Sequence, residues 1–378
     1  MERNTGRYIS RSPRRRAASV LGAVFCAVLT VLLLAAVLFG GGDSHPAGGS
    51  GAAVMDQFDM VIGNAVSDAL EGVLKLEKTY WLSDDVLTAP KPDPDCAGQS
   101  RDPGELQWLL DEAGEKVGAE DLLFNTQTEI VPGSTIQYYL DDTIFSIAWK
   151  QPVGHSVYSM AEVRIAHPSQ FRRFLSEGRY GSGVLHTASE MADSVNAVTA
   201  GSGDYYSYRP NGITVYNGDV CKVHGNDLDI CFVDENGDML FSRRKSLNDQ
   251  AAVEKFVEEH KVRFSLAFGP ILIENGDLCD FPFYPIGEVE KNYSRAALCQ
   301  QGKLHYILVE ANMEPGYHVS PNMSLFAKNL WEMGIRNAYA LDGGQTGTLY
   351  TNGEVFNSVD YGAERAISDI IYFATAQR

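Results

Sequence analysis

An apolar run that ends on an aspartate and two glycines is the densest chemical signal in this chain. Residues 338–341 read Ala-Tyr-Ala-Leu, and Asp342, Gly343 and Gly344 follow directly, with small polar residues up to Thr348. Glycines at such a point let the backbone approach a ligand and turn its amides toward it, which forms a concavity suited to anions. The alternative interpretation is a plain Asp-Gly turn, the commonest use of this pair.

Other kinds of site have no signature in the sequence. The histidines occur singly, without HxH or HxxxH spacing, and there is no CxxC pair, so no metal site is predicted. Asp234 begins a calcium-like fragment, but Lys245 stands where the bidentate glutamate is needed. Neither glycine-rich nucleotide pattern occurs, nor does the Gly-x-Ser-x-Gly elbow of the α/β-hydrolases. The sequence therefore predicts neither a metal nor another cofactor.

Five short motifs follow one another between about residues 142 and 373, at 202–206, 268–276, 294–297, 341–344 and 362–369. In this order they resemble the phosphodiester glycosidase family. The first is similar to the Asn-Gly-Asp-Tyr-Tyr of bacterial members, the second to their Phe-Gly-Pro strand and the third to Pro-Arg-Thr-Ala. Leu-Asp-Gly-Gly is similar to the most diagnostic string of the family, and the last motif to its closing Gly-Glu-Arg-x-Ile-Ser segment. The resemblance does not extend to the first 133 residues.

The resemblance implies a hydrolase that removes a sugar from a phosphodiester in extracellular or cell-envelope glycans, such as an exopolysaccharide. Phosphate is a good leaving group, so holding its charge and stabilising an oxocarbenium-like transition state matter more than strong proton donation. Arg295 and Arg365 suit a phosphate clamp, because a guanidinium forms bidentate hydrogen bonds to phosphate oxygens. Gly343, Gly344 and Thr346 complete the expected phosphate-binding group. We expect the two arginines to lie together and partly buried.

Three carboxylates are candidates for catalysis. Asp342 is the first choice, either facing the anomeric carbon or activating water, and Asp204 and Glu364 are the reserve partners. For Arg295, Arg365 and Glu364 the competing interpretation is an ordinary structural or surface ion pair.

Several motif positions depart from the family pattern. Serine replaces asparagine at 202, alanine replaces threonine at 296, Glu-Ala-Asn at 310–312 replaces Asp-Gly followed by Arg or Gln, and Gln-Thr-Gly at 345–347 replaces Gly-Ser-Ser. These substitutions support a second hypothesis. The same fold would then act without catalysis, as a glycan-binding protein or in the assembly of an envelope complex.

The periodicity of the chain predicts an α+β fold with a mostly antiparallel or mixed β-sheet core and flanking helices. Strands are expected at 136–140, 144–149, 157–165, 213–216, 230–233, 265–268, 305–309 and 338–341. Helices are expected from Pro168 to Leu175, near 249–260 and near 322–333. Short turns such as Asn217-Gly218 separate several of the strands.

The N-terminus predicts a membrane anchor. Six arginines precede an uncharged apolar run, so we assign 1–17 as a cytoplasmic basic tail and 18–39 as a transmembrane helix. A flexible linker at 40–55 and a helical stalk at 56–133 follow, with a helix starting at Pro103, and residues 134–378 form the glycosidase-like domain. The expected location is the cell membrane, single-pass, with the C-terminal domain outside the cytoplasm. The alternative is a cleaved signal peptide.

The chain is acidic apart from its N-terminal tail, and five cysteines follow the predicted anchor. The chain carries −18, and its first 17 residues carry +5, so residues 18–378 carry −23. This argues against a nucleic-acid partner. Cys221 and Cys231 flank a predicted turn and are expected to be bonded or adjacent across a hairpin, with reduced buried thiols as the alternative. Cys279 and Cys299 form a weaker candidate pair.

Overall fold

The computed structural model describes residues 88–125, 129–225, 227–286, 289–314, 317 and 319–377. The predicted anchor at 18–39, the linker and the first part of the stalk lie outside these residues. Within them, no helix is long and apolar enough to cross a membrane.

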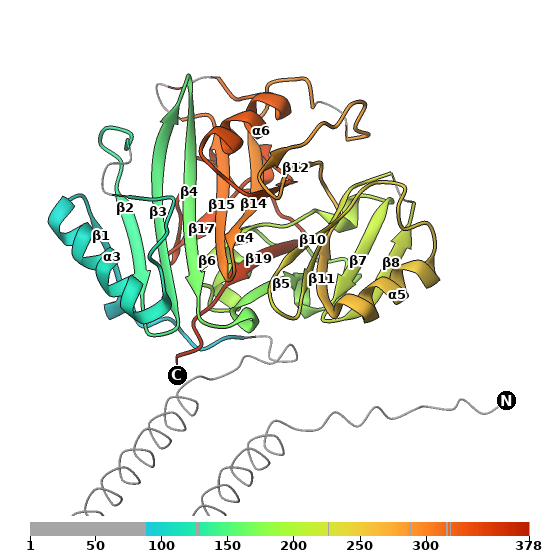
Figure 1. Cartoon of the computed structure of the whole chain (residues 1–378), viewed down its shortest axis with the longest axis horizontal. Coiled ribbons are helices and arrows are strands. Elements are labelled where there is room, and N and C mark those ends of the chain that lie inside the picture. The colour runs from blue at the N-terminus through green and yellow to red at the C-terminus, as the bar shows by residue number, and fades with distance from the viewer. Residues whose placement is uncertain are drawn as a thin grey trace, which may run out of the picture. The chain divides into compact units, whose positions relative to one another are not determined.

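Three antiparallel sheets form the described region (Figure 1). The largest has nine strands, in the order β1 (Ala97–Ser100), β2 (Ile136–Leu140), β3 (Ile144–Val153), β4 (Ser156–Ile165), β15 (His305–Asn312), β14 (Arg295–Gly302), β16 (Asn337–Leu341), β12 (Ile271–Glu274) and β13 (Asp277–Leu278). A five-stranded sheet has the order β10 (Met239–Ser242), β9 (Ile230–Asp234), β11 (Val262–Leu266), β7 (Gly212–Tyr216) and β8 (Asp219–His224). The third has the order β18 (Glu354–Val355), β17 (Leu349–Thr351), β6 (Thr199–Ser202), β19 (Asp369–Phe373) and β5 (Phe171–Leu175).

Four α-helices accompany the sheets in the described residues: α3 (Pro103–Val117), α4 (Ala188–Ser194), α5 (Gln250–His260) and α6 (Met323–Glu332). Six short 3₁₀ turns join them: η1 (Pro94–Cys96), η2 (Pro168–Gln170), η3 (Ser176–Gly178), η4 (Tyr206–Tyr208), η5 (Gly344–Thr346) and η6 (Asp360–Gly362). The sheets dominate and their pairings are antiparallel, which confirms the predicted α+β class.

The large sheet separates two apolar layers, because successive side chains of a strand point to opposite faces. On β14, Ala297 and Cys299 pack with α3 and α6, whereas Ala296 and Leu298 face the two smaller sheets. The second layer reaches Phe171 on β5 and Phe373 on β19, whose rings stack with their centroids 4.8 Å apart. On the face toward the smaller sheets, β15 carries Glu310, and β16 ends at Leu341, directly before Asp342.

The predicted helix from Pro168 to Leu175 is wrong. The proline opens only the single turn η2, and residues 171–175 form β5, which pairs with β19. Phe171, Phe174 and Leu175 have the spacing of a helical face, but on the strand Phe171 packs into the layer under the large sheet and Phe174 into a separate cluster around α4. Two apolar layers, one on each side of the strand, override the local pattern.

The part of the predicted stalk that is described packs on the large sheet. Strand β1 pairs with β2, and α3 begins as expected, with Asp102 capping the amide of Glu105 at 2.9 Å. The helix buries Leu106, Leu109 and Ala113 in the same layer as Trp149 of β3. The domain boundary expected at residue 134 therefore separates elements that share one hydrophobic core.

Both predicted disulfides are absent, and the five cysteines of the described residues are free. The turn between Cys221 and Cys231 does not pair their strands, because β7 and β11 lie between β8 and β9. Strands β16 and β12 likewise separate Cys299 on β14 from β13, which precedes Cys279. Burial raises the pKa of the Cys231 and Cys299 thiols, which keeps both protonated.

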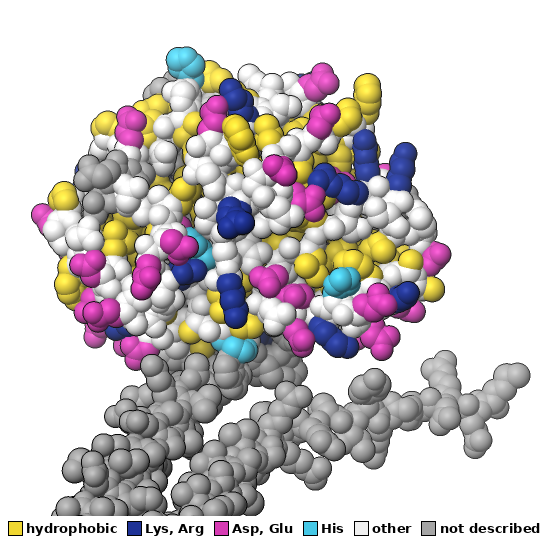
Figure 2. Space-filling model, in the orientation of Figure 1, with side chains coloured by type: hydrophobic (Ala, Val, Ile, Leu, Met, Phe, Trp, Pro, Cys, Tyr) yellow, Lys and Arg dark blue, Asp and Glu magenta, His cyan; other side chains and the backbone are white. Residues whose placement is uncertain are grey.

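Acidic side chains do not form a continuous surface on the face drawn in Figure 2, where basic and hydrophobic side chains lie between them. The negative net charge is thus spread over this face, and a local positive group can exist on it.

Candidate functional site

Asp342 follows β16 and is held by a tight turn. A side chain at Gly343 would lie 2.4 Å from the Ser294 carbonyl oxygen, and Gly344 has a φ of 68°, so both positions favour glycine. The Thr346 hydroxyl donates to the Gly343 carbonyl at 2.6 Å. Burial raises the pKa of Asp342 to about 6, against the opposing effects of Arg209, Thr346 and Arg365. The aspartate is therefore a carboxylate near its titration point at neutral pH.

Glu310 is a second carboxyl group beside Asp342, and it is not among the carboxylates predicted for catalysis. It lies on β15, opposite Ala296 of β14, which is itself opposite Leu341. Its side chain is 4 % exposed, and its Oε2 atom has no hydrogen-bond partner in the described residues. Burial raises its pKa well above the usual range, and the charges of Asp360 and Asp342 add to this. Burial therefore favours the protonated form of Glu310, which lies next to the ionisable Asp342.

Asn312 is a further buried polar residue, two positions beyond Glu310 on the same face of β15. Its Nδ2 group is buried and has no partner among the described residues. Its Oδ1 atom accepts from Asn357 at 2.8 Å. Unpaired buried polar atoms are rare in folded proteins and need an explanation. A ligand that accepts from Asn312 and pairs with Glu310 supplies one.

Glu310 and Gly347 fit each other. A Cβ atom at residue 347 would lie 2.5 Å from Oε2 of Glu310 and 3.3 Å from Cα of Gly343. Both positions depart from the family pattern, with the longer glutamate in place of aspartate and glycine in place of serine. The two departures therefore compensate each other, and the site keeps a carboxyl group.

A methyl group at residue 347 is expected to destabilise the protein. Gly347→Ala overpacks the space beside Glu310, which costs about 1–3 kcal/mol of unfolding free energy. Shortening the acid in the double variant Gly347→Ala/Glu310→Asp should recover part of this, with a coupling of about 0.5–3 kcal/mol in denaturant unfolding. The control is Gly302→Ala, where nothing lies within 4 Å. Strictly additive losses would show that the two residues do not share this space.

Two guanidinium groups flank Asp342. The Arg365 guanidinium lies 5.0 Å from the centre of the Tyr205 ring and 5.5 Å from that of Tyr208, and these rings stack at 3.9 Å. The Arg209 guanidinium lies 4.1 Å from the centre of the Phe268 ring. Neither guanidinium has an ion pair or hydrogen bond within the described residues, so their donors are available to an anion. Both lower the pKa of Asp342.

Tyr205 is strained at the centre of this group. Its φ is 62°, which a residue with a side chain rarely adopts. Its hydroxyl is buried and makes no well-formed hydrogen bond in the described residues, although Tyr208 lies near enough to help burial raise its pKa. Strained residues that the surroundings hold in place are concentrated at functional sites.

Asp204 lies behind the site in a buried ion network. Arg173 donates to Asp204 at 2.6 Å and to Asp369 at 2.8 Å, and all three side chains are fully buried. Asp204 also accepts from the Ala267 amide at 2.7 Å, and Asp369 from the amides of Asp204 and Tyr205 at 3.1 Å each. The network fixes the strained backbone at Tyr205, and it leaves Asp204 no evident role at the reacting atoms.

Glu364 and Arg295 are also engaged with the protein. Glu364 accepts from the amide of Ser189 at 3.1 Å and from its hydroxyl, at the start of α4. The Arg295 guanidinium donates to the carbonyl of Lys291 at 2.7 Å and to that of Pro321 at 3.4 Å, so it binds the loops around β14. Arg295 is 8 % exposed, whereas Arg365 is exposed and not partly buried as expected. Arg209 and Arg365 both lower the pKa of Asp342.

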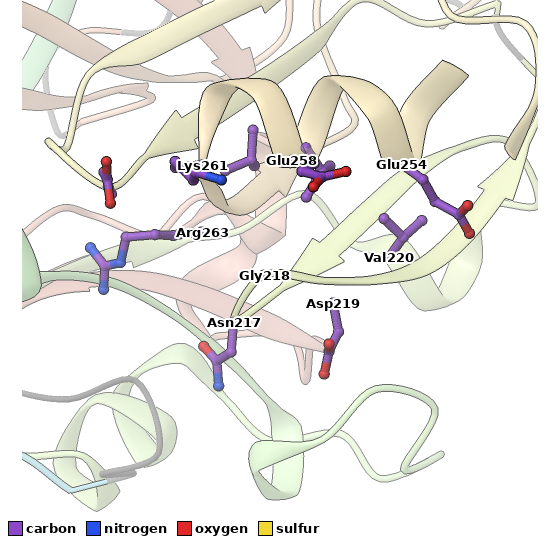
Figure 3. Close-up of a pocket in the computed structure, with 11 residues that line it drawn as sticks. Asn217, Gly218, Asp219, Val220, Glu254, Glu258, Lys261 and Arg263 are labelled. Carbon is purple, nitrogen blue, oxygen red and sulfur yellow. The ribbon is translucent and has the colours of Figure 1, made fainter. Parts of the chain in front are cut away.

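A larger hollow of about 760 Å³ lies elsewhere, between α5 and the β7–β8 turn (Figure 3). Asp219, Glu254 and Glu258 line it, and Arg263 is occupied by the carbonyls of Pro168 and Phe171. Its acids would repel an anionic ligand, and it shares no residue with the group around Asp342. No cluster of three or more His, Cys, Asp or Glu that could hold a metal ion occurs in the part of the chain that the structure describes.

Comparison with known proteins gives one family match, which covers less than half of the chain. Residues 192–374 match the model of the phosphodiester glycosidase family. The matched region contains Asp204, Arg209, Glu310, Asp342 and Arg365, but not Arg173.

Two solved structures are similar to the chain. One is the catalytic domain of zebrafish N-acetylglucosamine-1-phosphodiester alpha-N-acetylglucosaminidase, auto-inhibited by its pro-peptide, with 14% identity, a TM-score of 0.49, and coverage of 66% of this chain and 86% of that chain. The other is a hypothetical protein from Synechocystis, with 13% identity, a TM-score of 0.46, and coverage of 66% and 64%. No curated protein matches the chain.

Proposed function

We propose that this protein hydrolyses a sugar–phosphodiester linkage, releasing the sugar from the phosphate. The observation that carries the proposal is the arrangement of two unpaired guanidiniums, Arg209 and Arg365, around Asp342, beside the buried and unpaired acid of Glu310. The match of this region to the phosphodiester glycosidase family supports the same reaction class.

Each group has a role in this reaction. Arg209 and Arg365 bind the phosphate and stabilise its charge as the bond from the anomeric carbon to oxygen breaks, and the phosphate leaves with the electron pair. Asp342, ionised above about pH 6, stabilises the positive charge that develops on the sugar or takes a proton from the attacking water. Glu310, whose raised pKa favours the protonated form, donates a hydrogen bond to the bound substrate. Water supplies the new bond to the anomeric carbon.

The cellular setting is part of the proposal and rests on the sequence. The apolar run at 18–39, with arginines before it, would anchor the protein as a single-pass membrane protein with this domain outside the cytoplasm. Its substrate would then be an extracellular or envelope glycan that contains phosphodiesters.

The direct test incubates the full-length protein with a panel of sugar-1-phosphate diesters and measures the released sugar. We expect release from at least one diester and far slower release with Asp342→Asn. Binding of a diester by calorimetry without any release would favour the second hypothesis, a non-catalytic glycan-binding protein. The absence of both release and binding across the whole panel would overturn the proposal.

The pH profile should report the two carboxyl groups. Because Asp342 acts as a carboxylate and has a pKa of about 6, kcat/KM should rise through about pH 6. Because the pKa of Glu310 is raised and its proton is needed, kcat/KM should fall again on the alkaline side. The two limbs belong to the interacting pair rather than to isolated residues.

Glu310→Gln tests whether Glu310 causes the alkaline limb of the pH profile. The glutamine amide still donates a hydrogen bond, but it has no proton that titrates in this range. We expect this variant to keep the acid limb and lose the alkaline one. An unchanged alkaline limb would assign it to another group.

Arginine-to-lysine substitutions should distinguish Arg209 from Arg295. Lysine keeps the charge but loses the planar fork. Arg209→Lys is expected to raise the activation free energy by about 1–3 kcal/mol, with little change in Tm. Arg295→Lys is expected to lower Tm first, because the guanidinium connects the carbonyls of Lys291 and Pro321. The reverse outcome, with turnover sensitive only to residue 295, would restore Arg295 as the clamp.

A further inference from the structure

A third carboxyl group, that of Asp360, lies at the candidate site and has no part in the reaction as proposed. It begins the turn η6, and its Oδ1 atom accepts from the Ser294 hydroxyl at 2.8 Å. Ser294 is buried, and its carbonyl oxygen accepts from the Gly344 amide at 3.2 Å. Asp360 is therefore connected through a single residue to the turn that follows Asp342.

The loop that carries Asp360 is fixed to the end of β15. Asn357 donates to Oδ1 of Asn312 at 2.8 Å. Ser358 donates to Glu314 through its amide at 3.1 Å and through its hydroxyl at 2.6 Å. Asn312 is the last residue of β15, and Glu314 lies two residues beyond it. The position of the Asp360 carboxylate is thus set by hydrogen bonds on both sides of it, relative to the strand that carries the buried acid of the site.

Two negative charges act on that buried acid, Glu310. Burial is the main cause of its raised pKa, the charge of Asp360 comes next, and the charge of Asp342 follows. The residues paired with Glu310 on the neighbouring strands are Ser159 of β4 and Ala296 of β14, and neither is charged. A nearby like charge disfavours ionisation of a carboxyl group. Asp360 therefore acts on Glu310 in the same direction as burial does.

The basic side chains near the site act elsewhere. Arg209 and Arg365 lower the pKa of Asp342, and Lys150 forms an ion pair of 2.8 Å with the glutamate that follows β15. Two carboxyl groups thus have opposite surroundings, with guanidiniums around Asp342 and a further acid beside Glu310. Titratable groups whose surroundings push their pKa values apart divide the roles of base and acid between them.

We propose that Asp360 is a positioning residue for the reaction: held by the Ser294 hydroxyl, its carboxylate keeps Glu310 protonated while Asp342 is ionised. The inference rests on the proposed hydrolysis, which needs both forms at the same pH. With Asp342 as its only charged neighbour, Glu310 would lose its proton at a lower pH, and the range in which the enzyme works would be narrower.

The test is the pH profile of Asp360→Asn, which removes the charge and keeps an acceptor for the Ser294 hydroxyl. We expect the alkaline limb of kcat/KM to move about one pH unit lower, and the acid limb near pH 6 to move less. Asp360→Glu should restore the alkaline limb, because it restores the charge. A purely structural role would instead lower kcat/KM by the same factor at every pH and would leave the limb in place.

The matched control is Glu105→Gln on α3. Glu105 also accepts from a serine hydroxyl, that of Ser100 at 2.6 Å, and this variant loses the same unit of negative charge far from the site. It should move neither limb. A shift equal to that of Asp360→Asn would mean that net charge, and not the position of Asp360, sets the profile, and would overturn the inference.

A measurement without substrate separates failure of this inference from failure of the proposed function. The infrared band of a protonated carboxyl group, assigned to Glu310 by its loss in Glu310→Gln, reports the pH at which Glu310 titrates. In Asp360→Asn this pH should fall by about one unit. If no diester is cleaved but the band shifts in this way, the reaction fails and the role of Asp360 stands.

An unchanged titration of the band in folded Asp360→Asn overturns the inference, whatever the activity. Ser294→Ala provides a second variant in case Asp360→Asn does not fold. It keeps the charge of Asp360 but removes the hydrogen bond that holds it, so the band should titrate at a lower pH by a smaller amount. A band that does not move in this variant would likewise overturn the inference.

Discussion

Asp342→Asn should abolish most of the turnover without weakening the fold. A carboxylate that stabilises the developing positive charge or takes the proton of water contributes about 10²–10⁴-fold to the rate, and asparagine can do neither. We therefore expect kcat/KM to fall by this factor at pH 8, measured as sugar released from the best diester of the panel.

Unlike its turnover, the thermal stability of Asp342→Asn should not fall at pH 8. Burial raises the pKa of Asp342 to about 6, so the folded state prefers the protonated form more than the unfolded chain does. Stability contributed by this group is therefore lost as pH rises from about 4 to 6, and the full cost is present above that. Asparagine removes the cost, so Tm at pH 8 should equal or exceed that of the wild type.

The control for this prediction is Asp277→Asn, at an exposed residue of β13, which should change neither quantity. A fall in Tm together with activity would give Asp342 a structural role. Full turnover in a folded Asp342→Asn protein would remove it from the mechanism.

Much of the fold could be predicted from local patterns. Strands β2, β3, β4, β9, β15 and β16 follow from apolar runs bounded by turns, and α3 from its capping aspartate and proline. Helix α4 was missed although Thr187 and Glu190 form a capping box, because only one turn of apolar residues follows. The pairing of strands could not be predicted, since β8 and β9 are consecutive in the chain but two other strands lie between them in the sheet.

The site could be predicted in part. A glycine turn marks Asp342 and the closing motif marks Arg365, so both could be named from the sequence. In the structure both lie near Tyr205. Glu310 had a usable signal, a carboxylate between apolar residues of the run at 305–309 and Ala311. Arg209 had none, because its approach to Asp342 depends on contacts between distant segments. The sequence also does not show where a guanidinium points. That of Arg295 donates to backbone carbonyls.

The buried network behind Tyr205 should be the most sensitive point for stability. Arg173 lies on β5, the strand that the pattern predicted as a helix, and its guanidinium is the group that pairs with both Asp204 and Asp369. Gly203 belongs to the same arrangement, since a Cβ atom there would lie 1.9 Å from the Asp369 carboxylate. Without the arginine, two carboxylates would remain buried side by side.

Arg173→Met should therefore cost about 3–5 kcal/mol of unfolding free energy at neutral pH, because removing one partner leaves buried charge uncompensated. Methionine fills much of the volume, so the loss measures charge more than packing. The matched control is Arg243→Met, which breaks an ion pair with Glu274 whose side chains are 46% and 34% exposed and should cost no more than about 1 kcal/mol.

The pH dependence of the Arg173→Met loss identifies its cause. Burial already raises the pKa of Asp204 to about 6, and the coulombic effect of Arg173 opposes this rise. Removing the arginine raises the pKa of Asp204 further, so this carboxyl group takes up a proton in the variant as pH falls. The stability difference from the wild type should be largest above about pH 7 and shrink toward pH 5 in denaturant unfolding. A difference that stays constant across this range would mean that lost packing, and not uncompensated charge, destabilises the variant.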